Sequence, residues 1–262
     1  MKSQILKVAI DAALEAGKIQ KSKSGKPKNI EKKFGQETNL VTEVDKLCEK
    51  KIISIIRDTY PSHDILTEES GALKKISPYR WIIDPIDGTT NFAHGLPLFC
   101  VSIGIEFEKE IIAGVIFNPM TDELFYAERG KGAFLNSKQI FVSKTKKLID
   151  SLVVTGFPYN IKENPGRVIE HFVNFLPRAR GVRRLGSAAI DFAYVAAGRF
   201  DGYWEVFLNP WDKSAGILLV EEAGGKVTNF KNERANSFQQ SSLATNGLVH
   251  DEMIKVLKKK LK

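Results

Sequence analysis

The chain has 262 residues and is 43% hydrophobic, which is enough to bury one large domain or two small ones. Its formal net charge is +8, but the excess lysines gather at 18–33 and 255–262 without interleaved aromatic residues, so solvated faces are favoured over a nucleic-acid interface. No apolar run is long enough to span a bilayer, and the charged, amphipathic start predicts a helix rather than a signal peptide.

Domain organisation and compartment follow from the rest of the composition. No linker, repeat or low-complexity tract separates two folding units, so we expect one domain over 1–262, with halves of about 1–145 and 146–262. Cys48 lies in a helix pattern and Cys100 in an apolar strand pattern, and we expect both to be buried free thiols. Such thiols indicate a reducing cytoplasm.

In chain order, the hydrophobic spacing first predicts helices at 3–22 and 43–58, separated by a lysine-rich surface loop. Strands follow at 81–84, 98–107, 111–118 and 123–127, with a hairpin turn at 108–110 and a turn-rich return at 130–137. The second half alternates, with strands at 151–155, 182–184, 202–206 and 226–228 and helices at 165–176, 187–197, 212–223 and 250–260. Helices around mixed sheets indicate an α/β or α+β fold.

The most informative segment is 81–92, which reads as a buried strand that stops at Asp84, turns on Pro85 and presents Asp87. Two carboxylates three residues apart at a strand end converge on one spot, as a hard divalent cation requires. Gly88 and Thr89 then open a helix whose N–H groups and positive dipole end suit a phosphate. Taken alone, however, the segment is better explained as a β-turn, because Asp, Pro and Gly are common turn formers.

Two further acidic segments change this balance. Glu68 and Glu69 follow the short apolar pair 65–66 at what looks like another strand end, although alone they suggest a solvated loop. Asp212 starts an apolar helix that ends at the Gly224-Gly225 signal. By itself Asp212 is more readily a helix N-cap than a ligand, but a capping carboxylate keeps a second oxygen with which it can ligate.

Together the three segments resemble the inositol monophosphatase family, which belongs to a superfamily of Mg²⁺-dependent, lithium-sensitive phosphatases. Residues 84–92 match its first signature, 211–225 its second, and 68–70 the acidic segment before them; the likeness continues through 40–45, 186–189 and 244–248 and covers roughly 1–255. The resemblance implies a layered α-β-α-β-α sandwich of the sugar phosphatase type, usually a homodimer. It also implies a phosphomonoesterase that hydrolyses inositol monophosphate to inositol and phosphate.

The resemblance assigns two or three Mg²⁺ ions per subunit. One ion is held by the residues matching Glu68, Asp84 and the backbone carbonyl of Ile86, and a second by those matching Asp84, Asp87 and Asp212. Carboxylates suit Mg²⁺ better than His or Cys do, and two neighbouring cations can stabilise both the attacking and the leaving oxygen of an in-line displacement. The family usually has Asp where this chain has Asn39, so support for a third ion differs here.

Catalytic and substrate-binding roles are implied in the same way. Thr89 and Glu68 orient and deprotonate a metal-activated water, and Asp45 polarises the Thr89 hydroxyl, without a covalent phospho-enzyme. Backbone N–H groups of Gly88 and Thr89 hold the phosphate. Substrate hydroxyls meet Glu205 and the backbone of Gly186, Ser187 and Ala188, although Glu205 could equally be a surface acid on an edge strand.

Several alternatives stay open. Fructose-1,6-bisphosphatase, or a dual-specificity sugar phosphatase, is the main alternative within the superfamily. A non-catalytic, regulatory contact with the transcription machinery is an alternative of another class. The arginine cluster could form salt bridges with a partner subunit, contact a second anion or be solvated; it comprises Arg178, Arg180, Arg183 and Arg184.

Overall fold

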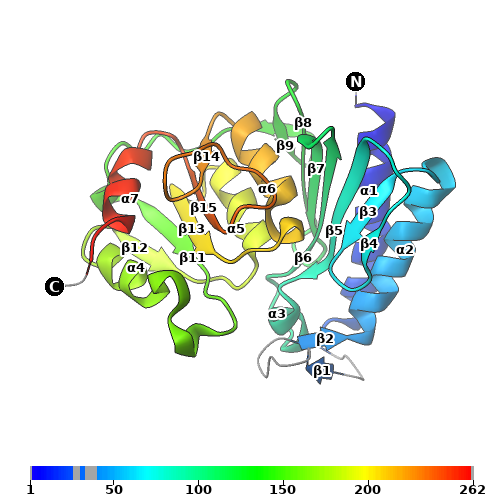
Figure 1. Ribbon diagram of the computed structural model, residues 1–262, viewed down its shortest axis with the longest axis horizontal. Coiled ribbons are helices and arrows are strands. Elements are labelled where there is room, and N and C mark those ends of the chain that lie inside the picture. The colour runs from blue at the N-terminus through cyan, green and yellow to red at the C-terminus, as the bar shows by residue number, and fades with distance from the viewer. Residues whose placement is uncertain (1, 26–29, 33–39, 261–262) are drawn as a thin grey trace.

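The computed structural model describes residues 2–25, 30–32 and 40–260 (Figure 1). Its larger sheet has eight strands in the order β10-β9-β8-β7-β6-β5-β3-β4. All its pairs are antiparallel except β3 with β5. The bounds are β3 (Asp64–Thr67), β4 (Gly71–Leu73), β5 (Tyr79–Asp87), β6 (Cys100–Phe107), β7 (Glu110–Asn118), β8 (Glu123–Glu128), β9 (Ala133–Leu135) and β10 (Lys138–Ile140).

The smaller sheet has five strands in the order β12-β11-β13-β15-β14. Strand β11 pairs in parallel with β12 and β13, and β15 pairs antiparallel with β13 and β14. The bounds are β11 (Leu152–Thr155), β12 (Gly181–Arg183), β13 (Gly202–Val206), β14 (Lys226–Thr228) and β15 (Ser241–Thr245). A separate antiparallel pair joins β1 (Ile30–Lys32) to β2 (Leu40–Thr42).

The helices form layers around the two sheets (Figure 1). Helices α1 (Gln4–Lys23) and α2 (Glu43–Thr59) cover the outer face of the larger sheet, and α5 (Ala188–Ala196) and α6 (Pro210–Glu222) lie between the sheets. Helices α4 (Val168–Phe175) and α7 (His250–Leu257) lie at the outer side of the smaller sheet, and the short α3 (Thr89–Ala93) follows β5. This order confirms the expected α-β-α-β-α sandwich.

Small residues bring α6 unusually close to the larger sheet. A Cβ on Gly104 of β6 would come within 2.2 Å of Ser214 Oγ, and one on Gly114 of β7 within 2.9 Å of the Ala215 carbonyl oxygen. Because only hydrogen atoms fit there, the start of α6 rests directly on strands β6 and β7. This contact places Asp212 beside the end of β5.

Several predicted boundaries were wrong. Strand β5 does not stop at Asp84 but continues to Asp87, with a register shift between the two residues. Helix α4 begins at Val168 rather than 165, because Asn164, Gly166 and Arg167 have left-handed φ angles and a 3₁₀ turn at 165–167 replaces the first helical turn. The return at 130–137 contains β9, which with β10 forms a hairpin.

Other predictions were confirmed. The β6–β7 hairpin turns at Glu108 and Lys109, which both have positive φ, as a two-residue type I′ turn requires. Cys48 and Cys100 are buried free thiols. Within the described residues, no helix is long and apolar enough to cross a membrane.

Candidate metal and phosphate site

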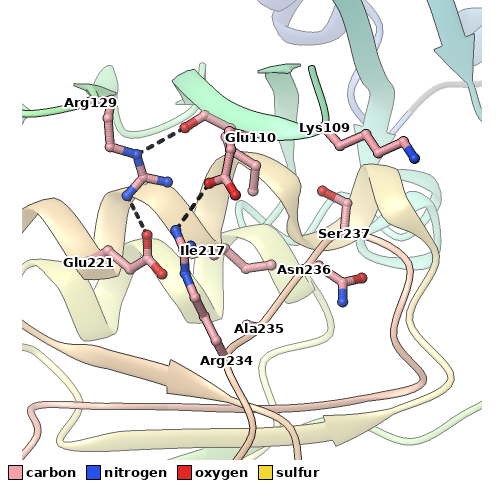
Figure 2. Close-up of a pocket in the computed structure, with 10 residues that line it drawn as sticks. Lys109, Glu110, Arg129, Ile217, Glu221, Arg234, Ala235, Asn236 and Ser237 are labelled. Atoms are coloured by element: carbon pink, nitrogen blue, oxygen red, sulfur yellow. Dashed lines mark hydrogen bonds and ion pairs between the residues drawn. The ribbon is translucent and has the colours of Figure 1, made fainter. Parts of the chain in front are cut away.

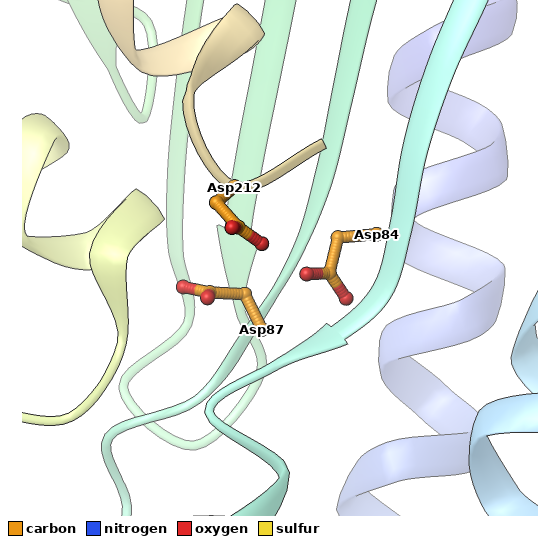
Figure 3. A group of neighbouring side chains, drawn as sticks. All are labelled: Asp84, Asp87 and Asp212. Carbon is orange, nitrogen blue, oxygen red and sulfur yellow. The ribbon is translucent and has the colours of Figure 1, made fainter. Parts of the chain in front are cut away.

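Three carboxylates converge where β5 ends and α6 begins. Asp84 and Asp87 come from β5 and Asp212 from the first turn of α6, and one oxygen of each lies within 4.8 Å of the others (Figure 3). Asp84 and Asp87 are almost fully buried, with 2% and 7% of their surface exposed. The tertiary fold thus joins two acidic segments more than a hundred residues apart.

Asp84 is fixed by the irregular end of β5. Its Oδ1 accepts a 2.9 Å hydrogen bond from the amide of Ile86, which bends the chain so that Asp87 turns toward the same space. The buried Gln20 of α1 donates a 2.7 Å hydrogen bond to the carbonyl oxygen of Pro85 and so holds the bend from behind. Gln20 lies 65 residues before Pro85, so the bend is held by a contact between segments that are distant in the sequence.

Asp87 is held by the first turn of α5. Its Oδ2 accepts hydrogen bonds from the Ser187 hydroxyl and, at 2.8 Å, from the amide of Ala189. The thiol of Cys100 lies 3.8 Å from the same oxygen. The Ser187 side chain is therefore turned toward the acids and is 2% exposed.

Asp212 is not the N-cap of its helix, contrary to the sequence-based interpretation. The N-cap is Asn209, Pro210 follows it at the first helical position, and Asp212 is the third helical residue. In this capping box Asp212 Oδ2 accepts a 2.6 Å hydrogen bond from the amide of Asn209. The neighbouring Lys213 is buried and donates to the Gln239 carbonyl oxygen.

Glu68 stands beside Asp84 because β3 and β5 are parallel neighbours. Thr67 pairs with Ile83, and the Glu68 amide donates a 3.3 Å hydrogen bond to the Ile83 carbonyl oxygen. The turn that carries Glu68 is held by Glu49 of α2. The Glu49 carboxylate accepts hydrogen bonds from Thr67 Oγ1 at 2.5 Å, from the Glu69 amide at 3.0 Å and from Ser70 Oγ.

Thr89 and Asp45 meet as the resemblance implied. The Thr89 hydroxyl lies 3.3 Å from Asp45 Oδ1 and 3.0 Å from the carbonyl oxygen of Ile86, and it can donate to one acceptor at a time. The other oxygen of Asp45 accepts from the amide and hydroxyl of Thr42 in the capping box of α2. A fixed carboxylate thus faces the hydroxyl.

Gly88 closes the distance between the two halves of the site. It has φ +92°, and a Cβ there would lie 2.9 Å from the Leu98 carbonyl oxygen and 3.2 Å from that of Gly186. A side chain is therefore excluded both by backbone conformation and by space. The turn at Gly88 rests against the 186–188 segment.

The acids raise one another's pKa values. Burial is the main cause for Asp84, whose pKa is raised well above its usual range, and the charges of Glu68 and Asp87 add to it. Burial likewise raises the pKa of Asp212, with Asp87 contributing, and raises that of Asp87 to about 6 against the hydrogen bond from Ser187. Negative charge is concentrated here in a low-dielectric setting, which a divalent cation would offset.

Glu205 lies on β13, which is a central strand of the smaller sheet, so it is not a surface acid on an edge strand. The Tyr203 hydroxyl donates a 2.6 Å hydrogen bond to Glu205 Oε2. Burial raises the pKa of Glu205 to about 7, and the charge of Asp87 adds to this shift.

The arginine cluster is divided by the fold. Arg178 donates to the Asn174 carbonyl oxygen, Arg180 pairs with Asp150 at 3.4 Å, and Arg183 donates to the Val182 carbonyl oxygen. Arg184 alone reaches the site, since a Cβ on Gly186 would meet its Nη1 at 2.9 Å. Asn39 lies outside the described residues.

A cavity of about 200 Å³ lies near the other end of α6 (Figure 2). Four of its charged groups are paired, Arg129 with Glu221 and Arg234 with Glu110, and Ser237 donates to the buried Glu106. The acid cluster at the start of α6 is therefore the better candidate for chemistry.

Sequence reasoning missed Glu49 and Gln20. Both are polar residues on the buried face of an amphipathic helix, Glu49 four residues after Asp45 on α2 and Gln20 near the end of α1. A polar side chain at a core position of such a helix must find a partner, and this signal was available in the sequence.

The donor set suits a hard cation. All the side chains that converge are carboxylates, which favours Mg²⁺, Mn²⁺ or Ca²⁺ over Zn²⁺, whose sites are rich in His and Cys. The buried, mutually repelling acids fit such an ion.

Comparisons with known proteins identify the family of the chain. The model of the inositol monophosphatase family matches residues 1–262. The chain is 40% identical over 261 residues to an inositol-1-monophosphatase of Mesorhizobium japonicum, covering 99% of this chain and 98% of the relative. It is 42% identical over 233 residues to a fructose-1,6-bisphosphatase/inositol-1-monophosphatase of Thermotoga maritima, covering 89% and 88%.

A solved structure shows the same fold. The extragenic suppressor protein suhB from Bartonella henselae superimposes with a TM-score of 0.93 at 39% identity, covering 99% of this chain and 100% of the other. The family is metal-dependent, and its members' activity supports a phosphatase that acts on a phosphorylated sugar or polyol. The chain belongs to the inositol monophosphatase family.

Proposed function

We propose that this protein is a Mg²⁺-dependent phosphomonoesterase that hydrolyses inositol monophosphate. The observation that carries the proposal is the cluster of Asp84, Asp87 and Asp212, in which one oxygen of each carboxylate lies within 4.8 Å of the others. The turn at Gly88 follows Asp87 in the chain. A metal-binding cluster beside free backbone amides is the arrangement that hydrolysis of a phosphate ester requires.

Glu68, Asp84 and the Ile86 carbonyl would hold one ion, and Asp84, Asp87 and Asp212 a second, so that Asp84 bridges. When bound, the ions neutralise phosphate charge and lower the pKa of water. The bend at Pro85, held by Gln20, sets the direction of the Asp84 carboxylate, which would contribute to holding both ions.

Thr89 and Asp45 act on the attacking water. The Thr89 hydroxyl donates to Asp45 and can therefore accept a hydrogen bond from the water, whose second proton Glu68 takes. The water oxygen bonds to phosphorus as the bond from phosphorus to the inositol oxygen breaks. The inositol oxygen leaves as the alcohol after taking a proton from a second water, and the hydroxide so formed is neutralised by the proton that Glu68 took. The N–H groups of Gly88 and Thr89 hold the phosphate oxygens throughout.

Substrate hydroxyls meet Glu205 and the backbone of Gly186 and Ala188. The Glu205 carboxylate is already oriented by the hydroxyl of Tyr203, and the charge of Asp87 helps to raise its pKa. Polar groups fixed in this way recognise hydroxyls by hydrogen bonds that an incorrect substrate leaves unpaired.

Fructose 1,6-bisphosphate is the second candidate substrate. The observation that favours it is the 42% identity with the Thermotoga maritima relative, whose name includes both activities. A regulatory role is a third candidate, since the Bartonella henselae protein of the same fold is named as an extragenic suppressor.

The two buried free cysteines support a cytoplasmic location. We further propose that the protein is a homodimer, which light scattering would test.

The test is phosphate release from inositol 1-phosphate, fructose 1,6-bisphosphate and adenosine 3′,5′-bisphosphate, with Mg²⁺ and after chelation. We expect inositol 1-phosphate to have the highest kcat/KM, and activity with every substrate to disappear on chelation. A higher kcat/KM for fructose bisphosphate would move the assignment to the second candidate. Absence of Mg²⁺-dependent release from all three would refute a sugar phosphatase.

A further inference from the structure

Ser187 was expected to contribute to the site through its backbone only. Its hydroxyl is instead buried, with 2% of the residue exposed, and it donates to Asp87 Oδ2. The same hydroxyl accepts a 3.4 Å hydrogen bond from the Ile190 amide as the N-cap of α5. One oxygen atom thus joins a helix start to an acid of the cluster.

The contact fixes how Asp87 is turned. The Ser187 hydroxyl and the Ala189 amide, at 2.8 Å, fill the lone pairs of Oδ2, so Oδ1 is the oxygen suited to ligation. Figure 3 shows the three acidic side chains close together, with the Asp87 carboxylate directed toward the side of α5. An Asp87 carboxylate without the hydroxyl could rotate and would enter the cluster at an entropic cost.

The thiol of Cys100 also lies close to Oδ2 of Asp87. Its Sγ lies 3.7 Å from Ser187 Oγ and 3.8 Å from Asp87 Oδ2. A thiol is a weak donor, so it cannot replace the hydroxyl as the group that orients the carboxylate.

We propose that Ser187 is a positioning residue that sets the metal affinity of Asp87 and couples it to the 186–188 segment. This inference rests on the proposed function, because it assumes that Asp87 is a ligand. The same helix start carries the backbone that would bind substrate hydroxyls and holds the ligand. Coupling free energies are reciprocal, so binding of the ion should in turn order the start of α5.

The experiment measures Mn²⁺ binding to the metal-free full-length protein by calorimetry, without substrate. Ser187→Ala should weaken binding about tenfold or more, the range seen when an outer-shell partner of a metal ligand is removed. Ser187→Thr keeps the hydroxyl and should restore affinity to within a few-fold. Ser187→Gly removes the hydroxyl but is tolerated better at an N-cap, so it serves if the alanine variant does not fold.

Ser3 provides the matched control. It is the N-cap of α1, where its hydroxyl accepts from the Leu6 amide at 3.3 Å. Ser3→Ala should destabilise the fold as an N-cap loss does while leaving Mn²⁺ affinity unchanged.

The coupling has its own readout in hydrogen exchange. Addition of Mn²⁺ should slow exchange of the amides at 188–190 in the wild type, and do so much less in the glycine variant.

The outcomes separate the two proposals. If the wild type binds no Mn²⁺, the metal site of the proposed function fails. If the wild type binds Mn²⁺ and both the alanine and glycine variants bind it within about twofold of wild type, Ser187 does not position the ligand. Equal weakening in Ser3→Ala would show that helix capping alone explains the effect.

Discussion

Glu68, the first residue after β3, lies beside Asp84 of the parallel neighbour β5, because the Glu68 amide donates a hydrogen bond to the carbonyl oxygen of Ile83, 3.3 Å away. The pairing of β3 with β5 is the one parallel contact in the larger sheet. Because the two strands run in the same direction, Glu68 and Asp84 lie at the same edge of the sheet.

Asp84→Asn should abolish turnover and should not destabilise the metal-free protein. The reason is that burial, with the charges of Glu68 and Asp87 adding to it, raises the pKa of Asp84, so an uncharged side chain is favoured there when no metal is bound. Phosphate release and thermal unfolding in chelator test both halves. The exposed Asp58 on α2 is the control, since Asp58→Asn should change neither. Near wild-type Mg²⁺-dependent activity in Asp84→Asn would sink the two-metal assignment.

Asp212 and Asn209 share one capping box, and two substitutions separate ligation from capping. Asp212→Asn keeps an acceptor for the Asn209 amide but loses the ligand charge, so activity should fall much more than melting temperature. Asn209→Ala loses the cap, at a cost of about 1 kcal/mol in unfolding free energy, and should retain most activity. If the two variants show the same ratio of activity loss to stability loss, Asp212 only caps the helix.

Glu205→Gln should weaken substrate recognition without changing metal dependence. Loss of one buried hydrogen-bonding partner typically costs about 1–3 kcal/mol, so kcat/KM for inositol 1-phosphate should fall clearly. Phenyl phosphate has no hydroxyls to recognise and should be hydrolysed almost as before. Equal losses for the two substrates would place Glu205 in the catalytic or metal-binding group.

Glu49→Gln should reduce activity through the turn that carries Glu68. The amide side chain fills the same space, but one of its two ends is no longer an acceptor for Thr67, Glu69 or Ser70. We expect weaker Mg²⁺ activation, seen as a raised Mg²⁺ concentration for half-maximal rate. The control is Glu15→Gln, an acid on α1 that pairs with Lys18 at the surface. Unchanged Mg²⁺ activation in Glu49→Gln would show that the turn holds without this carboxylate.

His250 should make stability fall in mild acid. Burial lowers its pKa to about 4, below the ordinary value of 6.5, and its ring nitrogens lie 3.0 Å from Thr228 Oγ1 and 2.8 Å from Thr245 Oγ1. Between these two pKa values the unfolded chain takes up a proton that the folded protein does not. Stability from this group is therefore complete above about pH 6.5 and falls by about 1.4 kcal/mol per pH unit as pH decreases toward 4.

Urea unfolding of wild type and His250→Gln between about pH 7.5 and about pH 5 isolates this contribution, because the other titrating groups are common to both proteins. The unfolding free energy of the wild type should drop more steeply toward acid. Parallel curves would mean that His250 titrates normally in the folded protein.

The sequence by itself determined the class of fold and the chemical identity of the site. Apolar spacing located most helices and strands, and the segments around Glu68, Asp84 and Asp212 carried the family signatures because ligand type and local backbone are encoded in neighbouring residues. Predicted helix boundaries were wrong where two local signals favour different residues as the start of the helix. At Asp212, for example, the N-cap is Asn209, because Pro210 is suited to the first helical position.

Only the tertiary structure decided what orients the acids. Ser187, Glu49 and Gln20 lie from 18 to 100 residues away from the groups that they hold, and such contacts depend on how α5, α2 and α1 pack against the sheets. Hydrogen bonding of a buried polar side chain requires a partner but does not specify which one, so the sequence alone cannot name it. Packing of glycines against α6 and of Gly88 against Gly186 then brings the two halves of the site together.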